Sequence, residues 1–256
     1  ANMIGVAAGL GITGKIRFAG SFAEIVTGRV YDQIRQEVCY GETNVKIAAS
    51  HAGITLGEDG ATHQTMEDIA LMRALPGMVV INPCDYNQTK AATIAAAKYD
   101  GPVYLRFGRP SVPNFTPEDQ EFEIGKAYVM NEGKDVTIFA TGHTVWEALK
   151  AADILEGEGI CAEVIDIATI KPLDEQAVVE SVMKTGAAVV AEEHNMPGGL
   201  GELIAGVLAA RRPAPMAYVN GGDKFGQTGK PAELMAAYGI DAEHIAEAAK
   251  TVIDRK

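Results

Sequence analysis

The sequence predicts an α/β fold with two open, mostly parallel sheets, one in each half of the chain. Short apolar runs of strand length alternate with segments of helical periodicity in both halves, a pattern typical of parallel sheets covered by helices on both faces. Closely spaced prolines and an acidic run interrupt this alternation at 110–133. Because 256 residues can form two cores, we place domains at 1–115 and 133–256, joined by a linker at 116–132.

The first half is expected to start in mid-element, because residues 1–10 are apolar like the body of a helix and have no capping residue before them. Ser21 is a plausible N-cap for a helix at 21–40, in which apolar residues recur at helical spacing. Further helices are predicted at 65–75 and 85–98. Strands are predicted at 16–19, 45–49, 78–81 and 103–107.

The second half repeats the alternation and again predicts an open sheet. Strands are predicted at 136–140, 162–167, 188–191 and 216–219. Helices are predicted at 144–155, 174–183, 202–208 and 241–253. A glycine turn at Gly198-Gly199 leads into the helix at 202–208.

Composition excludes several classes of protein. The formal net charge of -12 would repel phosphate backbones, so we expect no nucleic-acid partner. No apolar run approaches the roughly 20 residues of a membrane span, and the layout of a signal peptide is missing, so we expect a cytoplasmic protein without membrane contact. Three separated cysteines are expected to be reduced, buried thiols.

The segment 50–64 is the strongest candidate for a functional loop. It holds two histidines, two acids and three glycines without periodicity, and it begins where the predicted strand 45–49 ends. Ligands of open α/β sheets bind beyond the carboxyl ends of strands. Arg109 likewise follows the predicted strand 103–107. Plain turn formation and helix capping remain the alternative for the loop, and a surface ion pair remains the alternative for Arg109.

Other motifs give little support for specific chemistry. A G-x-G-x-x-G string at 9–14 precedes a strand instead of following one, so the match is accidental. The nucleophile elbow of acyl-transfer enzymes is missing, and a zinc site is weakly supported. His143 and His194 are expected at a helix cap or an interface. The set His51, Asp59, His63 and Arg109 suits a phosphorylated, hydroxylated substrate.

Several motifs resemble those of transketolase. The runs GEDGATHQ at 57–64, LMR at 71–73, PGM at 76–78 and PCD at 83–85 are similar to the domain that holds the aminopyrimidine ring of thiamine diphosphate. The runs VID at 164–166, IKPLD at 170–174 and EE at 192–193 resemble the C-terminal domain that transketolases share with the beta chains of 2-oxo-acid dehydrogenases. The resemblance covers nearly the whole chain.

The resemblance implies a role for each candidate residue. Phe22 would pack against the aminopyrimidine, and Ile25 would stand where a second aromatic residue is expected. His51 and Arg109 would bind the phosphate of the sugar, and Asp59 would bind a substrate hydroxyl. His63 would lie near the reacting carbon as the catalytic residue of this chain.

The implied activity is transfer of a two-carbon ketol unit from a ketose phosphate to an aldose phosphate, as in the pentose phosphate pathway. The family binds the diphosphate and Mg²⁺ through a Gly-Asp-Gly motif with a downstream asparagine, which this sequence lacks, since Gly221-Gly222-Asp223 lies in another context. The resemblance therefore implies the C-terminal subunit of a split transketolase, with cofactor and metal held mainly by a separate subunit.

We expect this subunit to self-associate, in a two-plus-two assembly with its partner. The family's catalytic glutamate is expected one position before Ala1, so the chain alone is expected to be inactive. Three alternatives stay open: a subunit like 1-deoxyxylulose-5-phosphate synthase, one like a 2-oxo-acid dehydrogenase beta chain, and a non-catalytic scaffold. His51 together with Asp59 favours transketolase over the first two.

Overall fold

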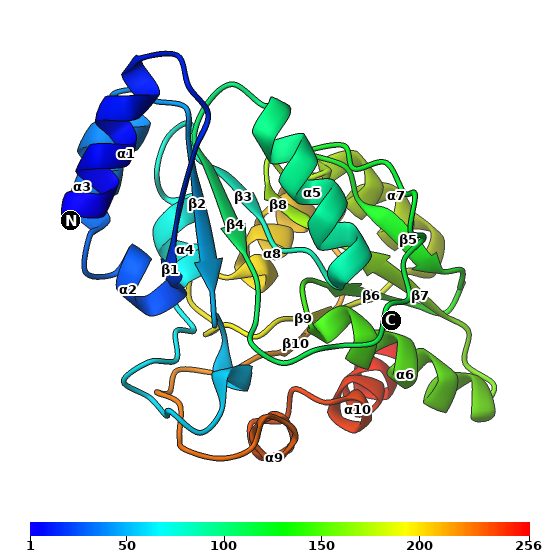
Figure 1. The fold of residues 1–256 in the computed structure, drawn as a ribbon. Helices are drawn as coiled ribbons and strands as arrows, with labels where there is room; N and C mark the ends of the chain where they lie inside the picture. Colours follow the sequence, from blue (N-terminus) through cyan, green and yellow to red (C-terminus); the bar gives the residue numbers. More distant parts are fainter.

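A computed structural model describes residues 1–256 and contains two five-stranded sheets flanked by helices (Figure 1). The strand order is β1-β2-β4-β3-β8 in the first sheet and β10-β9-β6-β7-β5 in the second. Eight of these strands pair in parallel, and each sheet has one antiparallel edge strand. The predicted α/β class with two mostly parallel sheets is confirmed.

The first sheet holds the candidate loop at the carboxyl end of a central strand. Its parallel strands are β1 (Arg17–Phe22), β2 (Val45–Ser50), β3 (Val79–Ile81) and β4 (Val103–Arg106). The helices of this half are α1 (Asn2–Ile12), α4 (Asp68–Arg73) and α5 (Tyr86–Lys98). β4 is buried at every position and β2 at most of them, and both strands are mostly apolar, as expected where helices cover both faces of a sheet.

The predicted single helix at 21–40 is wrong. Ser21 is not an N-cap but lies inside β1, because parallel pairing with β2 extends as far as Phe22 opposite Ser50. The remaining residues form α2 (Ala23–Thr27), α3 (Tyr31–Gln33) and a π-helix, η1 (Ile34–Tyr40), with a break at Gly28. The longer strand brings Phe22 beside the start of the loop.

The second sheet consists of β6 (Val136–Ala140), β7 (Ala162–Asp166), β9 (Ala188–Ala191) and β10 (Met216–Val219), with β5 (Tyr128–Asn131) antiparallel to β7. Its helices are α6 (Thr144–Gly157), α7 (Glu175–Thr185), α8 (Leu200–Arg211), α9 (Pro231–Ala237) and α10 (Ala242–Ile253). Both β5, which falls within the predicted linker, and α9 were missed by the sequence patterns.

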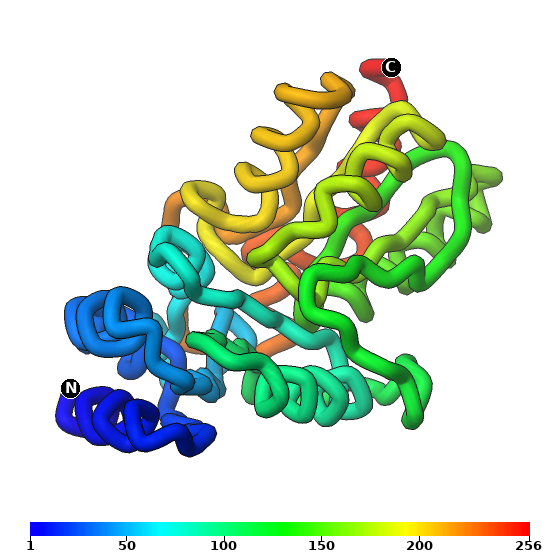
Figure 2. Tube along the Cα trace, turned by 90° about the horizontal axis from the view of Figure 1, so that it is seen from above, coloured from blue at the N-terminus to red at the C-terminus, as the bar shows by residue number.

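The two halves are joined by more than the connecting chain. Strand β8 (Thr169–Lys171) comes from the second half but pairs with β3 in the first sheet. The Lys171 ammonium donates to the backbone carbonyls of Arg73 and Leu75 at 2.9 and 2.6 Å. The largest core cluster combines apolar side chains of both halves. Figure 2 shows the halves side by side, with the chain termini at opposite ends of the molecule.

The predicted helix at 65–75 begins later, at Asp68, because Thr65 bridges to Gly53 across the base of the loop. The loop itself contains a single 3₁₀ turn, η2 (Ile54–Leu56). None of the helices has the length and apolar character required to cross a bilayer.

Candidate active site

The candidate residues come together at the carboxyl ends of β1, β2 and β4. Phe22 ends β1 and pairs in register with Ser50, the residue before His51. Beyond β4, the backbone N–H of Phe107 donates to Ala49 at 3.0 Å, and Phe107 in turn accepts from Ala52. These bonds continue the sheet past its last regular residues, so Arg109 leaves it on the same side as the loop.

Three aromatic rings form the centre of the site. The rings of Phe22 and His51 are stacked, with centroids 3.9 Å apart and planes 14° apart. His63 meets Phe22 edge-on, at 6.3 Å and 69°. Phe22 and His51 are half-buried, whereas His63 is exposed. The loop therefore brings both predicted histidines to the ring of Phe22.

His51 adopts an unusual backbone conformation and is favoured in its neutral form. Its φ of +61° lies in the left-handed region, which residues other than glycine seldom adopt. Burial lowers the pKa of the imidazole, as does the nearby guanidinium of Arg109, while Asp59 raises it. The ring nitrogen Nδ1 lies 2.9 Å from the Ser50 hydroxyl. A neutral ring leaves Nε2 available to a ligand.

The side chain of Arg109 contacts the loop. Its Nη1 donates to the carbonyl of Leu56 at 2.9 Å and lies 3.3 Å from the carboxylate of Glu58. Both side chains are exposed, and Asp59 beside them is exposed as well. The surface ion pair that remained as the alternative for Arg109 is thus present. The same guanidinium lies close enough to His51 to lower the pKa of its imidazole.

The sequence also predicts Ile25 as a residue that contacts the cofactor. Ile25 is half-buried on α2, three residues after Phe22, and outside the ring stack. The ring of Phe22 and the aliphatic side chain of Ile25 are both apolar and half-buried, the chemistry against which a flat aromatic ring packs. For the metal, the structure contains no group of three or more His, Cys, Asp or Glu side chains that could hold an ion.

Residues of the second half of the chain form hydrogen bonds with the loop. The side-chain amide of Gln64 donates to the carbonyls of Ile54 and Gly57 within the loop, and at 3.0 Å to Gln227 from the segment before α9. The carboxylate of Glu193 accepts from the backbone N–H of Thr55 at 2.7 Å. The loop is therefore fixed by residues more than a hundred positions away, which sequence spacing alone does not reveal.

A buried ion pair lies beneath the site. Arg106, at the end of β4, donates from Nε to Asp68 at 2.8 Å and from Nη2 to the carbonyl of Glu193 at 2.9 Å. Tyr104 also donates to Asp68, at 2.6 Å. Burial alone would raise the pKa of Asp68, but Arg106 holds it below its ordinary value. Sequence reasoning missed this pair. The usable signal was a charged residue, Arg106, inside a predicted apolar strand, because a charge buried in a sheet requires a partner of opposite charge.

Two histidines lie at the interface between the halves. His143 precedes α6 without capping it, and its Nδ1 lies 3.4 Å from the Thr55 hydroxyl. His194 accepts from the N–H of Ala70 at Nε2 and lies 2.7 Å from the carbonyl of Asn195 at Nδ1. Of the two roles left open for these histidines, helix cap or interface, the structure shows interface contacts for both. Of the cysteines expected to be buried, Cys39 and Cys84 are, but Cys161 is exposed.

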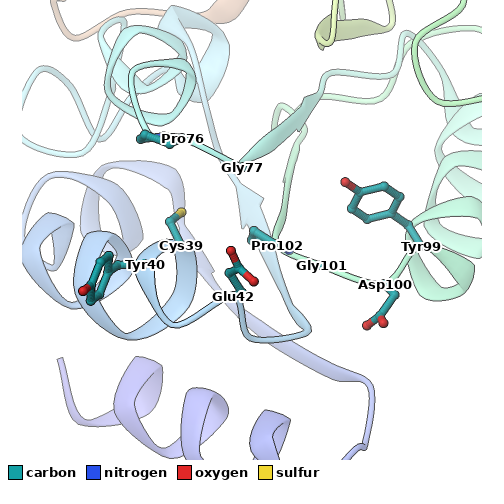
Figure 3. A pocket seen from close by; sticks show the side chains of 9 residues that line it. All are labelled: Cys39, Tyr40, Glu42, Pro76, Gly77, Tyr99, Asp100, Gly101 and Pro102. Carbon is teal, nitrogen blue, oxygen red and sulfur yellow. The ribbon is translucent and has the colours of Figure 1, made fainter.

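A separate pocket of about 510 Å³ lies at the opposite end of the first sheet (Figure 3). Its lining includes Glu42 and Pro102, which precede β2 and β4, and the aromatic ring of Tyr99. Nearby, the fully buried Lys46 donates to the carbonyls of Tyr99 and Gly101, and burial lowers its pKa to about 8. The pocket shares no residue with the loop.

Comparison with known proteins assigns the chain to one family. Residues 1–114 match the family model "Transketolase, pyrimidine binding domain", and residues 125–245 match "Transketolase, C-terminal domain".

Three curated relatives cover nearly the whole chain. A putative transketolase C-terminal section from Methanocaldococcus jannaschii is 48% identical over 96% of this chain and 78% of its own length. A 6-deoxy-6-sulfo-D-fructose transketolase subunit from a Clostridium species is 46% identical over 100% of this chain and 80% of its own. One of the subunits of an apulose-4-phosphate transketolase from Phocaeicola vulgatus is 37% identical over 97% of this chain and 80% of its own length.

Solved structures agree with these matches. A split-gene transketolase, described as an inactive beta4 tetramer, superposes with a TM-score of 0.94 and 47% identity, covering 99% of this chain and 81% of that chain. A Pichia stipitis transketolase variant in complex with xylulose 5-phosphate gives a TM-score of 0.76 at 26% identity, covering 93% of this chain and 34% of the other. The chain belongs to the transketolase family and carries that family's pyrimidine-binding and C-terminal domains.

Proposed function

We propose that this chain is a subunit of a thiamine diphosphate-dependent transketolase that transfers a two-carbon ketol unit from a ketose phosphate to an aldose phosphate. One observation carries the proposal: Phe22, His51 and His63 meet at the carboxyl ends of parallel strands, beside the charged side chains of Asp59 and Arg109. This edge of the sheet therefore combines an apolar ring surface with groups that recognise hydroxyls and an anion.

The cofactor is proposed to lie between this chain and a separate diphosphate-binding subunit. When bound, thiamine diphosphate supplies the chemistry that breaks and forms the carbon–carbon bond. Phe22 and Ile25 would hold the aminopyrimidine, and the partner would hold most of the diphosphate and Mg²⁺. The names of the relatives, a transketolase C-terminal section and a transketolase subunit, support this division.

Arg109 and His51 are proposed to bind the anionic group of the sugar. The planar fork of an arginine matches phosphate oxygens. When the Ser50 hydroxyl donates to Nδ1 of His51, the ring carries its proton on Nε2 and can donate it to the same anion. A dianion can displace the exposed Glu58 carboxylate, because exposed ion pairs contribute only about 0–1 kcal/mol.

Asp59 and His63 are proposed to act nearer the reacting carbons. Asp59, an exposed carboxylate, would accept a hydrogen bond from a substrate hydroxyl and so favour one stereochemistry. His63 has its Nδ1 2.9 Å from the Thr62 hydroxyl, which leaves Nε2 to hold or move a proton at the substrate hydroxyls.

The test uses the full chain combined with its partner subunit, thiamine diphosphate and Mg²⁺. Ketol transfer from xylulose 5-phosphate to an aldose phosphate is the expected result. Absence of transfer with every common ketose donor would refute the proposal. Consumption of pyruvate would instead favour a synthase-like or dehydrogenase-like subunit, and a folded complex without either activity would favour a scaffold.

A second candidate substrate carries a sulfonate in place of the phosphate. It is favoured by the relative at 46% identity, whose name specifies 6-deoxy-6-sulfo-D-fructose. A sulfonate has a single negative charge, and Glu58 already offsets part of the charge of Arg109. The ratio of kcat/KM for 6-deoxy-6-sulfofructose and fructose 6-phosphate, measured in one complex, distinguishes the two.

We also propose that the subunit works in the cytoplasm as part of an oligomer that contains more than one copy of each chain. The tetramer named for the split-gene relative supports self-association. Sedimentation of the chain with and without its partner tests the assembly.

A further inference from the structure

The backbone of the candidate loop needs outside support. His51 has a φ of +61°, and Gly53 and Gly57 have φ values of +79° and +91°. For a residue with a side chain, such a conformation persists only where the surroundings determine it. His51 keeps its ring stacked on Phe22 in this conformation, so whatever fixes the backbone at 53–55 also fixes the position of His51.

Glu193, from the other half of the chain, binds the loop backbone at this point. It follows β9, its exposed fraction is 3%, and its Oε1 accepts from the N–H of Thr55 at 2.7 Å. Gly53 packs so closely on the carboxylate that a Cβ at this position would lie 2.5 Å from Oε1. The Glu193 carboxylate therefore contacts the loop backbone at two neighbouring residues, Gly53 and Thr55.

Glu193 is itself held in place. Arg106, which is paired with Asp68, donates to the backbone carbonyl of Glu193 at 2.9 Å. The ring nitrogen Nδ1 of His143 lies 3.8 Å from Oε2 of the same carboxylate and 3.4 Å from the Thr55 hydroxyl. Arg106 thus fixes the backbone of Glu193, and the polar side chain of His143 lies beside its carboxylate, so the carboxylate is oriented toward the loop.

We propose that Glu193 is a positioning residue for the reaction: through the N–H of Thr55 it fixes the loop backbone that places His51 against Phe22. The inference rests on the proposed function. It gives the C-terminal half a direct role at the active site, although that half contributes no side chain to the aromatic cluster. Glu193 acts through the loop and does not touch the substrate.

Glu192 provides a matched control. It is equally buried and adjacent in sequence, but its carboxylate accepts from the N–H groups of Leu200 and Gly201 at the start of α8. It makes no hydrogen bond to the loop. A change at Glu192 therefore tests the general effect of altering a buried glutamate at this interface.

The experiment compares variants in the complete complex with the partner subunit. Glu193→Ala removes the acceptor, and Glu193→Asp withdraws it by one methylene, so both should raise the KM for the ketose phosphate by about tenfold or more with a smaller change in kcat. Glu193→Gln keeps an acceptor oxygen and should stay within about threefold of wild type. Glu192→Gln should lower the Tm and leave KM unchanged.

Two further readouts separate this inference from the proposed function. In a His51→Ala background, Glu193→Asp should cause no additional loss, because its effect passes through His51. Hydrogen exchange at the Thr55 amide should be faster in Glu193→Asp than in Glu192→Gln, whether or not the complex is active. A wild-type complex without transfer would refute the function alone, whereas wild-type KM and unchanged Thr55 exchange in Glu193→Asp would overturn the inference.

Discussion

The guanidinium of Arg109, which follows β4, lies 3.3 Å from the carboxylate of Glu58 in the candidate loop. The arginine that we propose for anion binding is therefore partly neutralised by an acid that an incoming phosphate must displace. Because both side chains are exposed, the pair contributes only about 0–1 kcal/mol, which makes it easy to open.

Glu58→Gln should lower the KM for a ketose phosphate by roughly two- to fivefold at low salt, because a competing negative charge is removed. Steady-state kinetics at two ionic strengths measure the effect, which should shrink as salt screens the charges. Glu158→Gln, which opens an exposed ion pair with Lys250 far from the loop, should leave KM unchanged. An unchanged or higher KM in Glu58→Gln would argue against anion binding at Arg109.

The buried pair of Arg106 and Asp68 should be important for stability. Asp68→Asn leaves a buried guanidinium without its counter-charge, so the free energy of unfolding should fall by about 3–5 kcal/mol. Denaturant unfolding of the full chain measures this, with Glu175→Gln as the control, because Glu175 and Arg211 form an exposed pair. A loss below about 1 kcal/mol would show that the pair is not a main support beneath the site.

Asp166 should make the protein less stable as pH rises. A carboxylate in an ion pair has the opposite effect, because its pKa is lowered in the folded state. Burial raises its pKa to about 7 from an ordinary value of 3.8, and Gln88 donates to one of its oxygens at 2.5 Å. Between these two pH values the folded state binds the extra proton, so the stabilisation from protonated Asp166 is complete below pH 3.8 and is lost as pH rises toward 7.

Asp166→Asn removes this titration. The free energy of unfolding of Asp166→Asn minus that of wild type should therefore rise between pH 4 and pH 8, by up to roughly 4 kcal/mol at 1.36 kcal/mol per pKa unit. Denaturant unfolding at a series of pH values gives the difference directly. A difference that stays constant across the range would mean that Asp166 titrates normally.

Much of the fold was predictable because it depends on local patterns. Apolar runs such as 136–140 and 188–191 lie in central, fully buried strands, and the structure confirms both. The helix predicted at 85–98 is capped by Asp85, whose side chain accepts from the N–H of Gln88. Such signals lie within a few residues of one another, so the sequence displays them directly.

The errors arose where distant residues decide the structure. Pairing with β2 extends β1 over Ser21, which local capping preference assigned to a helix. Strand β8 has three residues and forms only because β3 offers an edge. At the site, the polar, glycine-rich pattern of 50–64 singled out the loop histidines, but the bond between Thr55 and Glu193 spans 138 positions and required the three-dimensional structure.

Substitution of His63 shows whether the loop takes part in ketol transfer. His63 is exposed, and its hydrogen bond is to its neighbour Thr62, so His63→Ala should leave the free energy of unfolding and the binding of thiamine diphosphate unchanged. In the reconstituted complex, we expect kcat for transfer from xylulose 5-phosphate to fall by about a hundredfold or more. Unchanged turnover in that complex would mean that the loop is structural and does not take part in the transfer.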